Sequence, residues 1–287
     1  MRNIQLPPPS ASDLMLDILS GYGPQGLSVQ ALCKAGRVMD IAETNVRVAL
    51  NRLTNQSKIF SPQRGFYAID NEGYALHEDV ENWWTRENLI NEWAGHWVGA
   101  VAPHEKKTSV AGRRKHLRAL DLCGFREFMP YHYIRPNNLE GGVEGVRRKL
   151  FALGVVGTTS VYEIRHLSRP DEVRARSLWM SRDTVDGYDE LLQAVRKSSV
   201  RLETQSMETA ARESLMLGRY AIKFVMHDPL VPEELMPGES RRALVKELRA
   251  YQVMARKLWA QLIAQASSSR RHAVRPIVND IFLFQNI

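Results

Sequence analysis

The alternation of apolar and polar positions between Leu27 and Tyr67 predicts two consecutive helices followed by a hairpin. Ser28 is a suitable N-cap for a helix from Val29 to about Val38. A second helix is expected from about Glu43 to Asn55. The hairpin follows at residues 58–69, with a turn at Pro62-Gln-Arg-Gly. This order of elements is that of a winged helix-turn-helix, which places one helix in the major groove of DNA.

The second predicted helix separates its side chains onto two faces. At about 100° per residue, the apolar positions form one stripe that we expect to be buried. These positions are Val46, Ala49, Leu50 and Leu53. The opposite side presents Thr44, Arg47 and Asn51, with Val48 and Arg52 on its flanks.

The exposed residue types match those that recognise base edges. Arginine binds guanine through two hydrogen bonds, asparagine binds adenine in the same way, and apolar or threonine methyl groups contact the thymine methyl. Helix faces that only contact solvent usually carry pairs of Glu and Lys. On the exposed face of this helix we identify no such pair before Lys58. An ordinary surface helix of a small bundle stays open as the alternative.

The hairpin and the local charge agree with a duplex-binding unit. We expect Lys58, Gln63 and Arg64 to contact phosphate. Alternatively, Arg64 is a turn residue that favours solubility and makes no DNA contact. Residues 27–67 hold six cations against two acids, a surplus of four. Cations concentrated on one element are typical of DNA-binding domains.

The sequence predicts an α+β protein with three domains and a connector. Residues 10–70 form the DNA-binding domain and residues 71–94 a helical connector that includes two tryptophans. Residues 95–170 follow the order β-α-β-β-α-β, which is that of a ferredoxin-like domain. Residues 171–287 form a helical C-terminal domain, with helices expected at Val185–Lys197, Met207–Met226 and Ser240–Ala266.

The last of these helices carries an apolar stripe that requires a partner surface. Its members are Leu244, Leu248, Tyr251, Leu258 and Leu262. A second subunit and packing within the chain are both open as the partner.

Composition narrows the class of protein. The chain has 287 residues and a net charge of +7, enough for two or three domains and compatible with polyanionic partners. No apolar run approaches the roughly 20 residues that span a bilayer, so no membrane is expected. Cys33 and Cys123 lie far apart without metal-ligand or redox spacing, and a secretory signal is not evident, which predicts a cytoplasmic protein with two inert thiols.

Enzyme motifs are missing from the sequence. There is no Gly-x-Ser-x-Gly, no His-Glu-x-x-His and no Cys/His cluster at metal-ligand spacing. We therefore expect no catalytic residues, no metal and no cofactor. A nuclease of the ferredoxin-like type would need a carboxylate at the end of its first strand, where Val101-Ala-Pro-His stands instead.

Two segments are candidates for binding a small anionic effector. The densest basic run, His104 to Arg118, contains a helix that begins near Ser109, and its candidate residues are Arg113, Arg114 and His116. A solvated helix face is the alternative for this run. Gly141 to Lys149 invites comparison with phosphate loops but lacks the spacing of either nucleotide-binding motif.

Several segments together resemble the PaaX-type repressors of phenylacetic acid catabolism, over roughly Asp13 to Leu262. The matching segments are Asn45-Val-Arg-Val-Ala-Leu-Asn-Arg-Leu53, Gly65-Phe-Tyr-Ala-Ile69, Trp97-Val-Gly-Ala-Val101, Leu117-Arg-Ala-Leu-Asp-Leu-Cys-Gly-Phe125 and His227-Asp-Pro-Leu-Val-Pro-Glu-Glu-Leu-Met-Pro237. The last of these is similar to a specific Asp-Pro-x-Leu-Pro link of the family.

The resemblance implies a homodimeric, cytoplasmic transcriptional repressor that binds a palindromic operator in double-stranded DNA. It also implies three parts: a winged helix, a middle domain similar to the small CRISPR-associated ferredoxin-like nucleases, and a helical C-terminal domain. The family's founding inducer is an aryl-CoA thioester, so an acyl-CoA or aromatic acid is the expected effector. A metal-dependent nuclease and a ligand-independent DNA-binding adaptor are the alternative functions.

Overall fold

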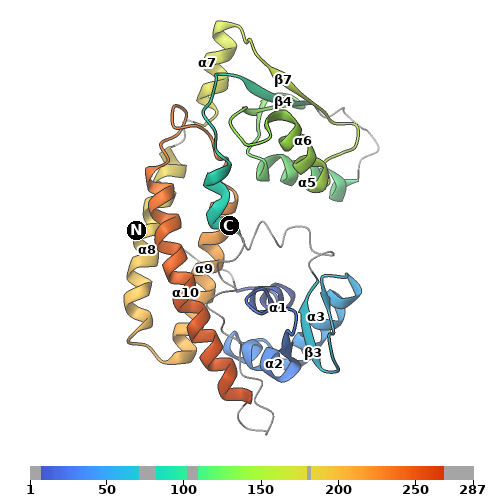
Figure 1. Ribbon diagram of the computed structural model, residues 1–287, viewed down its shortest axis with the longest axis vertical. Helices are drawn as coiled ribbons and strands as arrows, with labels where there is room; N and C mark the ends of the chain where they lie inside the picture. Colours follow the sequence, from blue (N-terminus) through green and yellow to red (C-terminus); the bar gives the residue numbers. More distant parts are fainter. Residues whose placement is uncertain (1–7, 71–81, 102–108, 180–181, 268–287) are drawn as a thin grey trace. The chain divides into compact units, whose positions relative to one another are not determined.

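The computed structural model describes residues 8–70, 82–101, 109–179 and 182–267. It combines helices with two small antiparallel sheets (Figure 1), which confirms a mixed helix-and-sheet protein. The chain divides into two compact units. The sheet unit consists mainly of residues 78–195 and 220–249, and the N-terminal unit of residues 2–77, 196–219 and 250–287. Among the described helices, none is both long and apolar enough to cross a membrane.

The N-terminal unit begins with helices and a small sheet. Its elements are α1 (Ala11–Ser20), β1 (Leu27–Ser28), α2 (Val29–Val38), α3 (Glu43–Asn55), β2 (Ile59–Phe60) and β3 (Phe66–Ile69). The strands form an antiparallel sheet in the order β1-β3-β2. The predicted bounds of α2 and α3 are confirmed, whereas the short strand β1 was not predicted.

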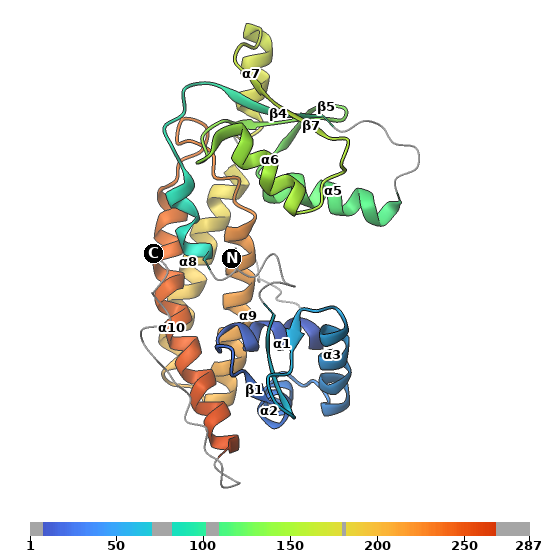
Figure 2. The ribbon, with the colours of Figure 1, turned by 45° about the vertical axis from the view of Figure 1, so that its right-hand side comes forward.

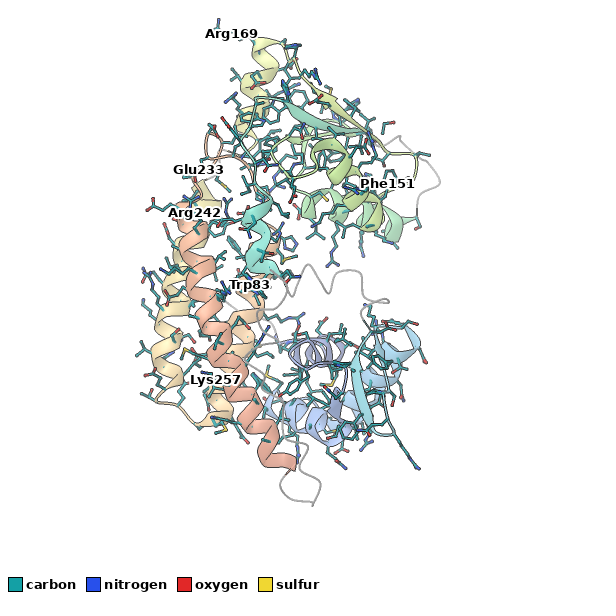
Figure 3. The ribbon with its side chains drawn as sticks, in the orientation of Figure 1. Trp83, Phe151, Arg169, Glu233, Arg242 and Lys257 are labelled. Atoms are coloured by element: carbon teal, nitrogen blue, oxygen red, sulfur yellow. The ribbon has the colours of Figure 1, made fainter. Side chains whose placement is uncertain are left out.

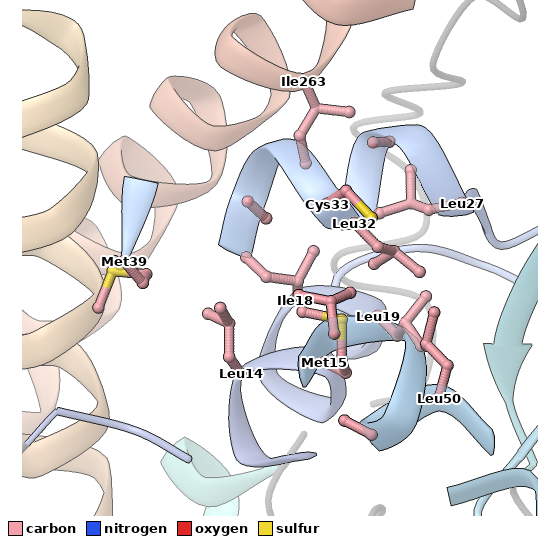
Figure 4. Packing of buried hydrophobic residues seen from close by; sticks show 14 of the residues in the cluster. Leu14, Met15, Ile18, Leu19, Leu27, Leu32, Cys33, Met39, Leu50 and Ile263 are labelled. Carbon is pink, nitrogen blue, oxygen red and sulfur yellow. The ribbon is translucent and has the colours of Figure 1, made fainter. Parts of the chain in front are cut away.

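Side-chain caps and a shared core fix these helices. The hydroxyl oxygens of Ser10 and Ser28 accept hydrogen bonds from the backbone N–H groups of Asp13 and Ala31, satisfying donors that a helix start leaves free. Leucines and methionines of α1, α2 and α3 fill the core (Figure 4). Ile263 of the last helix belongs to the same cluster and lies against α2 in Figure 4.

The sheet unit contains the second sheet and two helices that cover it. In chain order its elements are β4 (Trp97–Val101), α5 (Val110–Leu122), β5 (Arg126–Met129), β6 (His132–Pro136), α6 (Gly142–Ala152) and β7 (Ser160–Ile164). The strands are antiparallel in the order β5-β6-β4-β7. Gly99 at the centre of β4 lies opposite Ile134 of β6 and Tyr162 of β7.

Each face of this sheet has its own core. Val98 and Ala100 of β4 face α5 and α6, together with Leu120 and Leu150; both helices lie on this side of the sheet in Figure 2. Trp97 points to the opposite face, where its ring stacks on Trp179 at a centroid distance of 5.5 Å. The alternation of side chains along a strand explains why one strand supplies both cores.

Four further α-helices follow β7 in the described part of the chain. They are α7 (Arg169–Ser177), α8 (Arg182–Leu202), α9 (Met207–Met226) and α10 (Glu239–Ser267). The helix α7 is not among the helices that the sequence predicts, and it crosses the predicted domain boundary between residues 170 and 171. Pro170 occupies the first turn of α7 behind the Ser168 cap, where its missing N–H costs nothing.

The apolar stripe of α10 is covered within a single chain. Leu244, Leu248, Tyr251 and Leu262 are all buried, so intrachain packing accounts for the stripe without a second subunit. Leu258 is only half-buried and the neighbouring Trp259 takes the inward position. The predicted helical connector agrees in part: a 3₁₀ helix, η1, spans Trp83–Leu89, while residues 71–81 of the connector lie outside the described ranges.

Candidate nucleic-acid interface

The helix α3 presents one apolar face inward and one chemically mixed face outward. Its buried residues are Val46, Ala49, Leu50 and Leu53, as the periodicity predicts. All five predicted DNA-contacting residues of this helix are exposed: Thr44, Arg47, Val48, Asn51 and Arg52. The inward stripe therefore orients the outward residues, because a helix cannot bury one face without presenting the other.

The centre of the outward face is uncharged. At about 100° per residue, Thr44, Val48 and Asn51 fall within roughly 60° of arc. Val48 is 66% exposed. Arg47 and Arg52 lie on opposite sides of this ridge. The amide, hydroxyl and methyl groups of this ridge can contact base edges in a groove of DNA. The two flanking guanidinium groups can then contact the phosphate backbones on either side of that groove.

Arg47 is held by a neighbour that the sequence interpretation overlooked. Its guanidinium nitrogen lies 2.7 Å from the Glu43 carboxylate one turn earlier, and both side chains are 56% exposed. The hydrogen bond from Arg47 lowers the pKa of Glu43. The expectation that this face carries no acid–base pair is therefore wrong, since Glu43 and Arg47 form one at the usual i, i+4 spacing.

Close packing fixes the angle between α2 and α3. A β-carbon placed on Gly36 of α2 would lie 2.6 Å from a methyl group of Val46, so the two helices approach more closely here than an alanine would allow. Asp40 in the connecting turn has a φ of 56°. Arg212 of α9 lies 2.6 Å from the Asp40 carboxylate and donates a hydrogen bond to the Val38 carbonyl. The start of α3 is thus held by side chains distant in sequence.

The hairpin after α3 presents its turn to solvent. Ile59 pairs with Ile69 and Phe60 with Ala68. The turn closes through a hydrogen bond of 3.0 Å from the Phe66 N–H to the Gln63 carbonyl. Gln63 and Arg64 are exposed, whereas Lys58 at the base of the hairpin is half-buried. The turn therefore carries a cation and an amide that can reach a phosphate group.

The three predicted effector residues do not converge. Arg113 and Arg114 are exposed on α5, but His116 is 5% exposed and points into the core. The His116 Nδ1 accepts a hydrogen bond from the Val156 N–H, and burial lowers the pKa of the imidazole. The helix start near these residues is already capped, because the Ser109 hydroxyl accepts from the Gly112 N–H. The geometry of His116 is that of a neutral core histidine.

A buried polar network surrounds the Asp228-Pro229 link, a feature that the sequence interpretation noted only as a family motif. The Asp228 carboxylate accepts hydrogen bonds from Tyr188, from the Leu230 N–H and from Arg241. Arg86 donates to the backbone carbonyls of Val225 and Asp228. Long-range partners of this kind leave no periodic signal in a sequence.

A cavity of about 280 Å³ borders this network. It is lined by Glu87, Ile90, Val231, Glu233, Arg241 and Arg242. Both arginines are already neutralised, Arg241 by Glu87 and Asp228, and Arg242 by Glu233. The lining therefore offers no net positive charge to an anionic ligand. Across the described residues, no group of three or more His, Cys, Asp or Glu side chains could hold a metal ion.

Comparisons with known proteins define the fold but assign no activity. No family model matches the chain, and no curated protein matches it. Among solved structures, the uncharacterized protein Rv0674 from Mycobacterium tuberculosis is similar to it, with a TM-score of 0.58 and 17% sequence identity. The match covers 90% of this chain and 99% of that chain. At this identity the likeness shows a shared fold over nearly the whole of both chains.

Proposed function

We propose that the chain is a sequence-specific DNA-binding transcriptional repressor, similar to the PaaX type. The observation that carries this proposal is the outward face of α3, where Thr44, Val48 and Asn51 form a ridge between two arginines. The α1–α3 helices with the β2–β3 hairpin then act as a winged helix-turn-helix. In that arrangement α3 enters the major groove and Arg64 at the turn contacts a phosphate.

The finer architecture is part of the same proposal. The β4-α5-β5-β6-α6-β7 order and the strand order of the second sheet are those of a ferredoxin-like domain. A homodimer would present two copies of α3 to a palindromic operator, with half-sites about 34 Å apart, one turn of DNA. Since the α10 stripe is covered within the chain, the dimer contact uses another surface.

Release from DNA would follow from a shift between two arrangements of the dimer. A small-molecule inducer, for which an aryl-CoA thioester is our first candidate, must bind the DNA-incompetent arrangement more tightly. The N-terminal unit contains a path for such a signal. Arg212 of α9 contacts the turn before α3, and the Trp259 indole of α10 donates to the Ala211 carbonyl of α9. A movement of α9 would therefore reach α3 directly.

A titration of the full chain tests this function. Fluorescence anisotropy would follow binding to the promoter DNA beside its own gene and to a scrambled duplex, with and without phenylacetyl-CoA. We expect tight binding to the promoter alone and its loss on addition of one thioester. Equal binding to both duplexes, unaffected by any ligand, would support an adaptor. Cleavage of labelled DNA or RNA on addition of a divalent metal would support a nuclease.

A further inference from the structure

Several exposed arginines in the described part of the chain are neutralised by a nearby acid. Arg47, Arg165, Arg174, Arg201 and Arg242 all form salt bridges with Asp or Glu side chains. An arginine paired in this way makes a weaker contact with a phosphate, because the acid must be displaced or repels the incoming charge. The arginines without such a partner are therefore the ones available to a polyanion.

These available arginines are concentrated in two places. Among the described side chains, the exposed arginines without a salt bridge are Arg37, Arg52, Arg64, Arg113, Arg114, Arg118, Arg148 and Arg169. The first three belong to the proposed DNA-binding elements. The next four lie on α5 and α6, and Arg169 stands apart at the start of α7. Seven of these eight arginines therefore lie in the two places.

The arginines of α5 and α6 lie on the outward side of one layer. Leu120 of α5 and Leu150 of α6 point into the same core beneath the sheet. Arg114, Arg118 and Arg148 lie on the opposite sides of their helices, whereas Arg113 flanks the buried stripe and is exposed near the start of α5. Lys115 adds a further exposed charge and its side chain lies against Gly154, next to the end of α6. Figure 3 labels Phe151 of α6, whose side chain is 40% exposed.

The acids near this layer do not cancel its charge. Glu144 of α6 pairs with Arg147, and Asp121 of α5 pairs with Arg126 at 3.1 Å. Both acids are thus engaged by arginines other than the four exposed ones. The surface carries Arg113, Arg114, Arg118 and Arg148, and none of these four forms a salt bridge with a described acidic side chain. An open row of guanidinium groups is complementary to an extended polyanion more than to a small ligand.

We propose that the outward surface of α5 and α6 binds the phosphate backbone of duplex DNA as a second, sequence-independent contact in addition to that of α3. This inference rests on the proposed function, since it takes DNA as the partner of the chain. The helix α5 has no Asn, Gln, Ser or Thr within its bounds, so it lacks the amides and hydroxyls that distinguish bases. Its arginines can bind guanine as well as phosphate, and in this proposal they contact the phosphate backbone. The contribution of α5 is therefore to affinity and to its salt dependence, not to sequence preference.

Neutralising this surface tests the proposal. In the triple variant R113Q/R114Q/R118Q, three charges are removed while glutamine keeps a high helix propensity. Binding of the full chain to promoter and scrambled duplexes would be measured from 50 to 300 mM NaCl. Because each phosphate contact adds about 0.9 to the slope of log K against log salt, we expect the slope to fall by about 2 to 3 on both duplexes.

A matched control removes the same charge elsewhere. The exposed lysines Lys223, Lys246 and Lys257 lie on α9 and α10, and the variant K223Q/K246Q/K257Q should leave the slope nearly unchanged. Circular dichroism melts would establish that both triple variants are folded. If a triple variant unfolds, the single substitutions R114Q and R118Q replace it, each with an expected loss of about 0.9 in slope.

The outcomes separate this inference from the proposed function. An α5 variant that behaves like the lysine control, while the parent protein still prefers its promoter, overturns the second surface and leaves the repressor proposal intact. A parent protein that binds all duplexes alike, with a slope reduced in the α5 variant, supports the surface and contradicts sequence-specific repression. Unchanged DNA binding with lost response to phenylacetyl-CoA would assign the surface to the effector and overturn the inference.

Discussion

The helices α3 and α5 have the same length of thirteen residues and opposite surface chemistry. Each buries one apolar stripe against its own unit. The outward face of α3 centres on Thr44, Val48 and Asn51, whereas that of α5 is dominated by Arg113, Arg114 and Arg118. One face combines amide, hydroxyl and methyl groups, and the other offers charge alone.

This difference indicates what each helix can distinguish. Amides and methyl groups recognise particular base edges because their hydrogen-bonding pattern is directional. Unpaired guanidinium groups bind any phosphate and gain free energy from counterion release, whatever the sequence. Substitutions in α3 should therefore change the choice of DNA sequence, and substitutions in α5 should change its salt dependence. That division of roles depends first on the packing that orients α3.

The largest effect is expected from the buried side of α3. Leu50 is 1% exposed, and Leu50→Ala should lower the free energy of unfolding by about 2–5 kcal/mol through the lost burial and the cavity it leaves. Val48, two residues earlier and 66% exposed, provides the matched variant. Val48→Ala should change the free energy of unfolding by less than about 0.5 kcal/mol. Urea unfolding of the full chain would measure both.

The pair of variants is informative in either direction. If both variants lose about 2–5 kcal/mol of unfolding free energy, Val48 is covered, for instance by a second subunit, and does not belong to the DNA-contacting face. If both variants keep the stability of the parent protein, Leu50 does not anchor the helix.

The second largest effect is expected on DNA discrimination. Arg47→Ala and Asn51→Ala should each weaken binding to the promoter by about 1–3 kcal/mol, or roughly 5- to 150-fold, because a bidentate contact with a base is lost. Binding to scrambled DNA should fall much less. Arg118→Gln on α5 is the contrasting variant, with equal losses on both duplexes. Equal losses for Arg47→Ala on the two duplexes would assign Arg47 to the phosphate backbone.

Local structure was predictable wherever a repeating pattern met a cap. The bounds of α3 follow from its apolar stripe, and those of α2 and α5 follow from the stripe together with Ser28 or Ser109. The exposure of the five candidate residues on α3 needed no tertiary information, because burial of one helix face determines the other. The strand β1 was missed since two residues are too few for an alternation to be seen.

The remaining features depend on contacts that local patterns do not encode. Arg212 meets Asp40 across 172 positions of sequence, and Arg241 meets Glu87 across 154. His116 looked like part of a basic surface in sequence, but the phase of α5 turns it inward toward Val156. The pair Glu43–Arg47 is different, because its i, i+4 spacing was visible in the sequence and could have been found there.

A smaller effect is expected at the turn of the hairpin. Arg64 lies at the exposed turn, where we expect it to contact phosphate, so Arg64→Ala should weaken promoter and scrambled DNA alike. The slope of log K against log salt should fall by about 0.9, the value for one phosphate. Gln63→Ala removes a neutral neighbour at the same turn and should leave that slope unchanged. A selective loss on the promoter would instead place Arg64 in a groove.

The smallest effect concerns pH, where the units that carry α3 and α5 should respond in opposite directions. Burial raises the pKa of the Asp17 carboxyl on α1 to about 6, against the lowering effect of Arg219. Between pH 3.8, the ordinary pKa of the carboxyl, and about 6, Asp17 is protonated in the folded state and ionised in the unfolded state. Stability from this group is lost as the pH rises from about 4 to 6. The side chain is 31% exposed, which keeps the effect modest.

His116 beneath α5 has the opposite sign. Burial lowers its pKa below the ordinary value of 6.5, so the unfolded state takes up a proton first and stability is lost as the pH falls below that value. Hydrogen exchange of α1 and α5, followed by mass spectrometry between pH 5 and 7, can resolve the two units.

Each substitution is compared with the parent protein at the same pH. Asp17→Asn should increase the protection of α1 from exchange more at pH 7 than at pH 5, because it removes a carboxylate that is costly to bury. His116→Asn keeps an acceptor for the Val156 N–H and should benefit α5 more at pH 5 than at pH 7. Parallel responses in the two helices would show that neither group governs its own unit, and that the pH dependence arises elsewhere in the chain.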